Sequence, residues 1–431
     1  MILLVIVCCV LGVLRGDFTC GAVAAKQKTE ISFWNGFTGP DGRVMLEMIR
    51  EFNDQNPDVN VTMQRIPWDL YYNKVMVSGL DDRGPEVFVV HASALIRMHR
   101  SGILAKENSL FEGANAIPTE DFDPYVLEQT LFGSDRYALP LDIHPQGMYC
   151  NADMLKAVGL TNPDGSARAP VTKEEFLKAA HAMMKPNGSD HPDTFGFALT
   201  AWQNNFSSLV PQFDGEYLDK NGKCCLNHPN NIKALEFLAS LRSKEKLIPP
   251  PDNQMGWTGF QQKKVGMVWD GIWMVGNMKT LEGFHGIGAP IPTIGNHPGT
   301  LADSHCLCLK PSLSDKKREA GERFIRFLSA SSLKWAGAGQ VPARKSVRDL
   351  PAFKEMQVQY AFSKQIPYMK YPPRITTLFE MGLEITLAVE KVVRGNATAK
   401  EALDIANVNA QKAMDRDEET QRQAASKKEL R

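Results

Sequence analysis

Two tryptophans flank an Asp-Gly pair directly after an apolar segment, in the sequence Trp269-Asp-Gly-Ile-Trp273. An indole ring can stack on the apolar face of a sugar, and a neighbouring carboxylate can accept hydrogen bonds from sugar hydroxyls. The same spacing also suits the end of a strand whose indoles are both buried in a core. The residues of this segment leave the two alternatives open, and the same holds for Trp202 and Trp257.

Two carboxylates, Asp142 and Asp270, stand at the ends of strand-like segments and are the candidates for a glycosidase. Such an enzyme needs a pair of carboxyl groups on either side of the scissile bond. Carboxylates that only hydrogen-bond sugar hydroxyls give the same pattern. The sequence has no G-x-S-x-G, H-E-x-x-H or catalytic-cysteine signature. We therefore expect a binding protein rather than an enzyme.

Two histidines also follow strand-like segments. His91 comes after an all-apolar run, with Ser93 two residues later, and His144 lies two residues after Asp142. A histidine in such a position is either structural or a ligand contact, and the residue pattern does not decide between the two. Arg344, after Val-Pro-Ala, is open to the same two interpretations.

Charge and motif content exclude several classes of partner. The chain has 49 basic and 49 acidic residues, so we expect neither a nucleic acid nor an anionic membrane surface as a partner. No G-x-x-x-x-G-K-[ST] motif is present, and no G-x-G-x-x-G motif follows the first strand-like segment, which argues against nucleotide binding. We predict no cofactor.

The cysteines beyond the N-terminal segment are Cys150, Cys224, Cys225, Cys306 and Cys308. Their odd number and the lack of a C-x-x-C pair argue against a disulfide framework. His305 stands next to Cys306, which raises zinc binding as an alternative. Three ligands so close together on a strand cannot all point the same way, so we expect buried thiols and no metal site.

The N-terminal segment has the features of a leader. Residues 2–14 form an unbroken apolar run, and Ala22-Val-Ala24 offers a cleavage site. This pattern predicts a signal peptide over residues 1–25, although no Lys or Arg precedes the apolar run. Cys20 is an alternative site for a lipid anchor, but Asp17-Phe-Thr19 differs from the small apolar residues that this processing favours. We expect the protein to be secreted, periplasmic or held at the outer face of the cytoplasmic membrane.

The periodicity of the remaining chain indicates an α/β fold. Residues 30–34 and 59–63 alternate as strands do, and the apolar residues between them recur at helical spacing. Such a βαβ unit requires a parallel sheet, in which ligands bind at the carboxyl ends of strands. We expect further helices at 231–243 and 314–328, and a helical tail from about 376 to 413.

A series of short segments matches one known family in content and order. The segments are Ile31-Ser-Phe-Trp34, Gly39-Pro-Asp-Gly42, Glu51-Phe-Asn-Asp-Gln-Asn-Pro57, Gly84-Pro-Glu-Val-Phe88, Ser101-Gly-Ile-Leu104, Gly147-Met-Tyr-Cys-Asn151, Val158-Gly-Leu160, Trp269-Asp-Gly-Ile-Trp273 and Gly339-Gln-Val-Pro-Ala-Arg344. Together they resemble the extracellular solute-binding proteins of ABC importers, in the large sugar-binding family that includes the maltose and glycerol-3-phosphate binders. Each segment is degenerate, and their number and order make the match specific.

The resemblance implies two α/β lobes, joined by crossing strands, that close on a ligand about a hinge. It assigns residues 28–140 and 290–335 to the first lobe. The second lobe takes residues 141–289 and 345–413, and a charged, frayed tail follows over 414–431.

The resemblance and the residue patterns together give the predicted ligand contacts. They are Phe37, Thr38, His91, Ser93, Asp142, His144, Trp202, Asp270, Gly271, Trp273, Arg344 and Phe379. The family pattern also separates the two indoles of the first motif. Trp273 is expected to face the ligand, whereas Trp269 is expected in the core.

The sequence departs from the family pattern at several of these places. Glu86 replaces the usual Asp after Gly-Pro, and Cys150 replaces a second Tyr. His91 and His144 stand where maltose-type binders have apolar or acidic residues, which argues against maltodextrin itself as the ligand.

These observations predict a monomeric binding protein that captures a mono- or oligosaccharide by lobe closure and delivers it to the membrane subunits of an ABC permease. The alternative is a binder of glycerol phosphate, a phosphorylated sugar or another small anion. That alternative requires a basic side chain such as Arg344 or Arg374 in the cleft.

Overall fold

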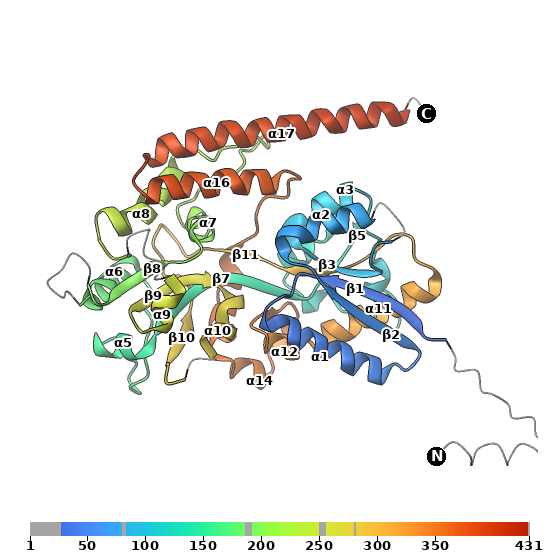
Figure 1. The fold of residues 1–431 in the computed structure, drawn as a ribbon, viewed down its shortest axis with the longest axis horizontal. Helices are drawn as coiled ribbons and strands as arrows, with labels where there is room; N and C mark the ends of the chain where they lie inside the picture. The colour runs from blue at the N-terminus through green and yellow to red at the C-terminus, as the bar shows by residue number, and fades with distance from the viewer. Residues whose placement is uncertain (1–26, 80–82, 186–191, 250–255, 280–281, 430–431) are drawn as a thin grey trace, which may run out of the picture.

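The computed structural model describes residues 27–79, 83–185, 192–249, 256–279 and 282–429. The predicted signal peptide and Cys20 lie outside the described residues. Figure 1 shows two lobes, each built around a β-sheet, and the long strand β7 (Asp142–Asn151) running between them. The predicted two-lobed α/β fold is confirmed.

The first lobe contains a five-stranded sheet in the order β2-β1-β3-β12-β6. β1 pairs in parallel with β2 and β3, as the βαβ pattern predicts, and β12 runs antiparallel to β3. The strands are β1 (Thr29–Asn35), β2 (Val59–Arg65), β3 (Val87–His91), β6 (Leu139–Pro140) and β12 (His305–Leu309), with a hairpin of β4 (Leu131–Phe132) and β5 (Asp135–Arg136). The helices are α1 (Pro40–Gln55), α2 (Trp68–Gly79), α3 (Leu95–Arg100), α4 (Pro124–Glu128), α11 (Asp315–Ala330) and α12 (Ser332–Ala336).

The second lobe contains a larger sheet in the order β14-β11-β7-β9-β8, with β10 and β13 also paired to β7. Its strands, besides β7, are β8 (Phe195–Leu199), β9 (Val265–Gly271), β10 (Gly286–Ala289), β11 (Thr300–Asp303), β13 (Val341–Pro342) and β14 (Met369–Lys370). Its helices are α5 (Ala152–Ala157), α6 (Lys173–Ala182), α7 (Trp202–Gln212), α8 (Pro229–Ser243), α9 (Gly256–Gln261), α10 (Val275–Lys279), α16 (Leu378–Val393) and α17 (Ala399–Glu429). Three short helices follow β13: α13 (Lys345–Arg348), α14 (Pro351–Lys354) and α15 (Gln357–Ser363).

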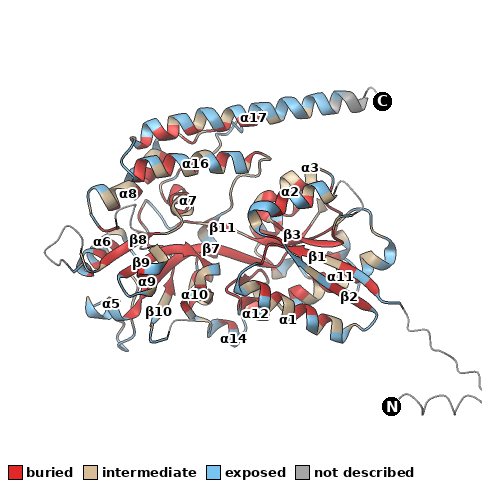
Figure 2. Ribbon diagram, in the orientation of Figure 1, coloured by how far each residue is buried: buried red, intermediate tan, exposed pale blue. Residues whose placement is uncertain are grey.

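The strand β7 is the structural link between the lobes. All of its residues are buried, and Figure 2 shows this burial along its whole length. Near its start it pairs with β13 and β11, and further on it pairs with β9 and β10. The chain also passes between the sheets at Ser304, which separates β11 of the second lobe from β12 of the first.

One predicted boundary between the lobes is wrong. The sequence assigns residues 290–335 to the first lobe, but β11 pairs with β7 and β14 in the second lobe's sheet. Ile291 and Ile294 also pack in the core that contains Phe176 and Leu235. The chain therefore re-enters the first lobe at Ser304, because the strand pairing changes there.

The predicted helical tail consists of two helices, and the predicted fraying after residue 413 is wrong. Gly395, in the left-handed region with φ 79°, ends α16, as is usual just beyond a helix C-terminus. α17 then continues to Glu429 and lies along α16 (Figure 1). Side-chain pairs spaced four residues apart, such as Arg422 with Glu418 at 3.2 Å, stabilise the exposed part of this helix.

Trp269 lies in the core of the second lobe, as the sequence predicts. Its side chain is 0% exposed, and its ring centroid lies 4.9 Å from that of Phe197 and 5.2 Å from that of Phe176. The indole therefore fills space between the sheet and the helix α6.

Replacing Trp269 with alanine should lower the free energy of unfolding by about 3–5 kcal/mol, because it leaves a large cavity among packed rings. Urea denaturation measures this change. The matched variant Trp273→Ala, whose indole is 38% exposed, should lose about 1 kcal/mol or less. Equal losses in the two variants would contradict the assignment of Trp269 to the core.

Candidate ligand-binding cleft

A cavity of about 810 Å³ lies between the lobes. The first lobe lines it with the loop after β1, the start of α2, the end of β3 and the start of β12. The second lobe lines it with α7, α16 and the 3₁₀ turn Ile272–Met274, and β7 contributes the floor. The loop after β1, Trp68 after β2 and His91 at the end of β3 lie at carboxyl ends of parallel strands, where the fold class places a ligand.

Aromatic rings stand on both sides of this cleft. Trp68 lines the first-lobe side, and the loop after β1 makes room for its ring, because a Cβ at Gly36 would lie 2.1 Å from the indole. Trp273 and Phe379 line the second-lobe side and are 38% and 48% exposed. Exposed ring faces of this kind can stack on the apolar face of a sugar.

The polar lining is almost free of charge. Among the cleft residues that the structure describes, Asp41 and Asp303 are the carboxylates and none is a lysine or arginine. Gln146 and Gln340 are buried, and the Oε1 atom of each has no hydrogen-bond partner in the described part of the chain. An unpaired amide oxygen can accept a hydrogen bond from a hydroxyl group.

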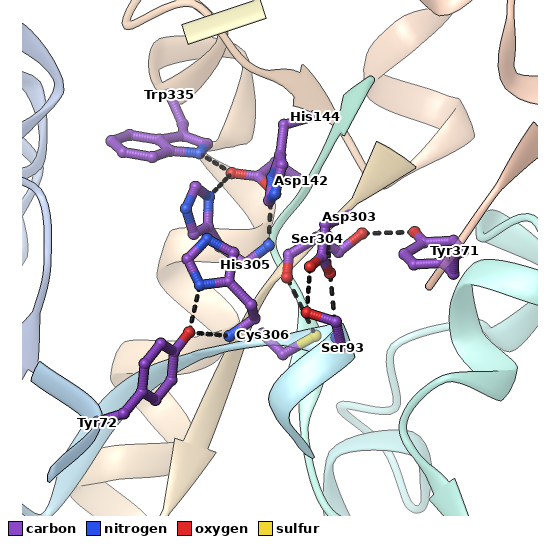
Figure 3. A network of polar contacts seen from close by, with 11 residues as sticks. Tyr72, Ser93, Asp142, His144, Asp303, Ser304, His305, Cys306, Trp335 and Tyr371 are labelled. Carbon is purple, nitrogen blue, oxygen red and sulfur yellow. Dashed lines mark hydrogen bonds and ion pairs between the residues drawn. The ribbon is translucent and has the colours of Figure 1, made fainter. Parts of the chain in front are cut away.

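Beneath the cleft, one buried carboxylate organises a polar network (Figure 3). Asp142 Oδ1 accepts hydrogen bonds from His144 Nδ1 at 3.2 Å and from the His305 backbone N–H at 2.9 Å. Its Oδ2 accepts from His305 Nδ1 at 2.7 Å and from Trp335 Nε1 at 2.6 Å. The carboxylate therefore joins β7, β12 and α12, which belong to both lobes.

The network shifts the ionisation of its members. Burial alone would raise the pKa of the Asp142 carboxyl, but the neighbouring His305 and the hydrogen bonds from both histidines hold it well below its usual value. Burial alone would lower the pKa of His305, but Asp142 raises it. Burial, reinforced by His305 and His144, lowers the pKa of His91 well below its usual value.

Five of the predicted contacts line the cleft. They are Thr38, His91, His144, Trp273 and Phe379. They come from the loop after β1, from the end of β3, from β7 and from the start of α16, as expected from the strand order. The structure therefore brings these five residues together in one cavity, and their contact with a ligand stays a prediction.

Three predicted contacts lie behind the lining rather than in it. Phe37 is 0% exposed and packs against His305 and Trp335. Ser93 donates its hydroxyl and its backbone N–H to Asp303. Asp142 is 0% exposed and fully engaged in the network described above. We reassign these residues from ligand contact to support of the cleft.

Four predicted contacts lie elsewhere, because nearby partners hold them. The Trp202 indole donates to the Leu199 carbonyl and stacks under Arg394, outside the cleft. Asp270 accepts hydrogen bonds from Trp257 Nε1 at 2.6 Å and from the Gly271 N–H at 2.7 Å. Neither Asp270 nor Gly271 lines the cleft. The two carboxylates considered for a glycosidase are thus both outside the lining.

Arg344, the fourth of these, forms an ion pair with Asp121 at 2.5 Å. Arg374 donates to the carbonyls of Glu128 and Leu131 and lies over the ring of Phe132. Neither arginine lines the cleft, so the basic side chain that an anion binder requires is not supplied by either.

Several cleft residues escaped the sequence analysis. Trp68 follows Pro67 directly after β2, so its place at a strand's carboxyl end was available as a signal. His305 was considered only as a neighbour of Cys306. The contributions of α7, such as Gln203 and Asn204, depend on how that helix packs on the sheet and leave no local pattern.

The matches to known proteins agree with this geometry. Residues 47–359 match the family model described as bacterial extracellular solute-binding protein. The chain belongs to this family. Family membership implies an extracytoplasmic location, and no helix among the described residues combines the length and apolar character needed to cross a bilayer.

Two curated relatives from Bacillus subtilis (strain 168) are similar to this chain over most of their length. The arabinooligosaccharide-binding protein is 25% identical over 420 residues, which cover 90% of this chain and 88% of the relative. The galactooligosaccharide-binding protein is 21% identical over 399 residues, which cover 89% of each.

Solved structures share the fold. A substrate-binding protein of Listeria monocytogenes in complex with cycloalternan superposes with a TM-score of 0.77 at 21% identity, covering 90% of this chain and 99% of that chain. The sugar-binding protein MalE of Xanthomonas citri gives a TM-score of 0.77 at 21% identity, covering 92% of this chain and 100% of that one.

The buried network yields a stability prediction. Asp142→Ala should lower the free energy of unfolding by about 3–5 kcal/mol, because it leaves the buried donors of His144, His305 and Trp335 without their acceptor. Urea denaturation measures the loss. The exposed helical residue Asp54 provides the control, and Asp54→Ala should change stability by about 0.5 kcal/mol or less. Near-equal stability of the two variants would contradict the role given to Asp142.

Proposed function

We propose that this protein is the substrate-binding component of an ABC importer and that it captures a neutral oligosaccharide between its lobes and delivers it to the membrane permease. The observation that carries the proposal is the chemistry of the cleft. Aromatic rings line both sides, two glutamines of the lining have unpaired amide oxygens, and no lysine or arginine is among its described lining residues. This set of groups suits hydroxyls and apolar sugar faces.

The size of the cavity favours a ligand of more than one sugar ring. Its volume of about 810 Å³ lies in the upper part of the range typical of small-molecule sites. The names of the two curated relatives, an arabinooligosaccharide binder and a galactooligosaccharide binder, support the same size class. The rings of Trp68 and Trp273 would each contact a different part of such a chain.

The alternative of a phosphorylated or otherwise anionic ligand is less well supported. Asp41 and Asp303 place negative charge in the cleft, and the two arginines that the alternative needs are held elsewhere. Binding an anion here would leave its charge without a lysine or arginine partner among the described lining residues, which is costly in a partly buried site. We propose capture without chemistry, since Asp142 and Asp270 do not line the cleft.

The fate of the leader segment and the cellular location of the protein are also part of the proposal. We propose that the leader is either removed near Ala24 or retained as a lipid anchor on Cys20. In both cases the protein works outside the cytoplasmic membrane as a monomer.

Isothermal titration calorimetry on the protein tests the ligand class. Arabinotriose or a galactooligosaccharide should bind with one site and micromolar or tighter affinity, whereas glucose 6-phosphate and glycerol 3-phosphate should give no measurable heat of binding. The physical reason is the neutral lining. If only the phosphorylated compounds bind, the carbohydrate proposal is wrong in favour of the anion alternative.

A matched pair of tryptophan variants tests the site. Trp273→Leu should weaken oligosaccharide binding about tenfold, because leucine keeps apolar volume but loses the flat stacking face. Trp202→Leu should leave the affinity unchanged, because that indole packs outside the cleft. The reverse order of effects would place the sugar somewhere other than the cleft described above.

A further inference from the structure

Three histidines converge on the floor of the cleft. One ring nitrogen from each of His91, His144 and His305 lies within 4.8 Å of those from the other two. The ring centroids of the three pairs are 4.5, 4.8 and 5.3 Å apart. All three side chains also line the cavity, so the cluster is open to a ligand from one side.

Strand pairing explains why residues so distant in sequence meet here. His91 and His305 are directly opposite in the antiparallel pair of β3 and β12. His144 lies opposite Asp303 in the pair of β7 and β11, and Asp303 stands two residues before His305 in the chain. The sheet of one lobe therefore supplies two rings, and the hinge strand supplies the third.

In each of the three rings, Nδ1 already has a hydrogen-bond partner within the protein. Nδ1 of His144 and Nδ1 of His305 each hydrogen-bond one oxygen of Asp142, at 3.2 Å and 2.7 Å. Nδ1 of His91 hydrogen-bonds the Tyr72 hydroxyl. In the described part of the chain, Nε2 of each ring has no hydrogen-bond partner, and Nε2 is the atom left for a ligand.

This arrangement is the one that metal-binding histidines use. A carboxylate or another oxygen on the far ring nitrogen orients the imidazole and leaves the near nitrogen as the electron-pair donor. The surrounding charge also favours a cation, because Asp142 lies behind the rings, Asp41 and Asp303 line the cleft, and no lysine or arginine is found among the described lining residues.

We propose that His91, His144 and His305 form a binding site for a divalent transition-metal ion of the zinc type, with a further coordination position facing the cleft. Imidazole nitrogens suit Zn²⁺, Co²⁺, Ni²⁺ and Cu²⁺, whereas Mg²⁺ and Ca²⁺ prefer oxygen ligands. Zinc–nitrogen bonds of about 2.0–2.1 Å bring tetrahedral ligands to about 3.3 Å from each other, so small ring rotations must close the cluster around the ion.

The open coordination position would receive a water molecule or a hydroxyl of the captured ligand. Because His144 belongs to the hinge strand and the other two rings belong to the first lobe's sheet, the ion would also link these two elements. The site is made by this chain alone, and its existence does not depend on the identity of the sugar.

Zinc titration of the chelator-treated protein, without sugar, tests the proposal. At pH about 7.5, ZnCl₂ should bind with one site and micromolar or tighter Kd by calorimetry, and should raise the melting temperature. Co²⁺ should give the strong visible absorption of a four-coordinate histidine complex. MgCl₂ should give neither a heat of binding nor a rise in melting temperature.

Matched variants locate the ion. His144→Gln should weaken Zn²⁺ binding at least tenfold and abolish the Co²⁺ absorption. Tyr72→Phe, which keeps the ring and removes only the hydroxyl behind His91, should weaken it about tenfold. His285→Gln is the control, because His285 pairs with Asp153 on the surface, at 3.2 Å, and should have no effect.

If His144→Gln fails to fold, Tyr72→Phe and the Co²⁺ spectrum still decide. Absence of a stoichiometric Zn²⁺ site, or a site that binds unchanged in both His144→Gln and Tyr72→Phe, overturns the proposal. Because no sugar is present, failure here leaves the proposed carbohydrate function untouched.

Discussion

The carboxylate of Asp142 lies where the chain passes between the lobes, and the arrangement of the cleft depends on it. A buried charge is costly unless donors satisfy it. Here the donors come from β7 itself, from the start of β12 and from Trp335 of α12, so they belong to separate segments of the chain. The carboxylate is satisfied only when these segments meet, and their meeting sets the positions of His144 and His305 in the cleft wall.

Ion pairs hold two arginines near the hinge, and this explains why their side chains are not part of the cleft lining. Arg344 pairs with Asp121, and Arg348 pairs with Asp123 at 2.5 Å, so these cations stabilise the backbone near the hinge instead of facing a ligand. The described lining of the cleft holds aromatic, aliphatic and polar side chains, the carboxylates of Asp41 and Asp303 and three histidines, without lysine or arginine. Weak, directional contacts of this kind suit a ligand that must bind tightly when the lobes close and still leave when they open.

Much of the fold follows from local patterns in the sequence. Alternating and helical periodicities are short-range properties, so the βαβ unit and the helices α8 and α11 were predictable. The strand ends that carry Thr38, His91 and His144 follow from the same patterns and from the family resemblance. The partners of Trp202, Asp270 and Arg344 are set by packing between distant segments, and a single sequence holds no signal for them. Charge content alone also suggested fraying after residue 413, although α17 continues through pairs four residues apart.

The lobes touch across the mouth of the cleft, where the rings of Tyr72 and Phe379 lie 5.3 Å apart and Arg97 lies over Phe379. A sugar that contacts both walls should favour this conformation over more open ones. Small-angle X-ray scattering with and without a saturating oligosaccharide tests this central claim most directly. Closure about the Asp142 hinge predicts a smaller radius of gyration with the sugar bound. An unchanged radius at full occupancy, established by calorimetry on the same sample, would contradict it.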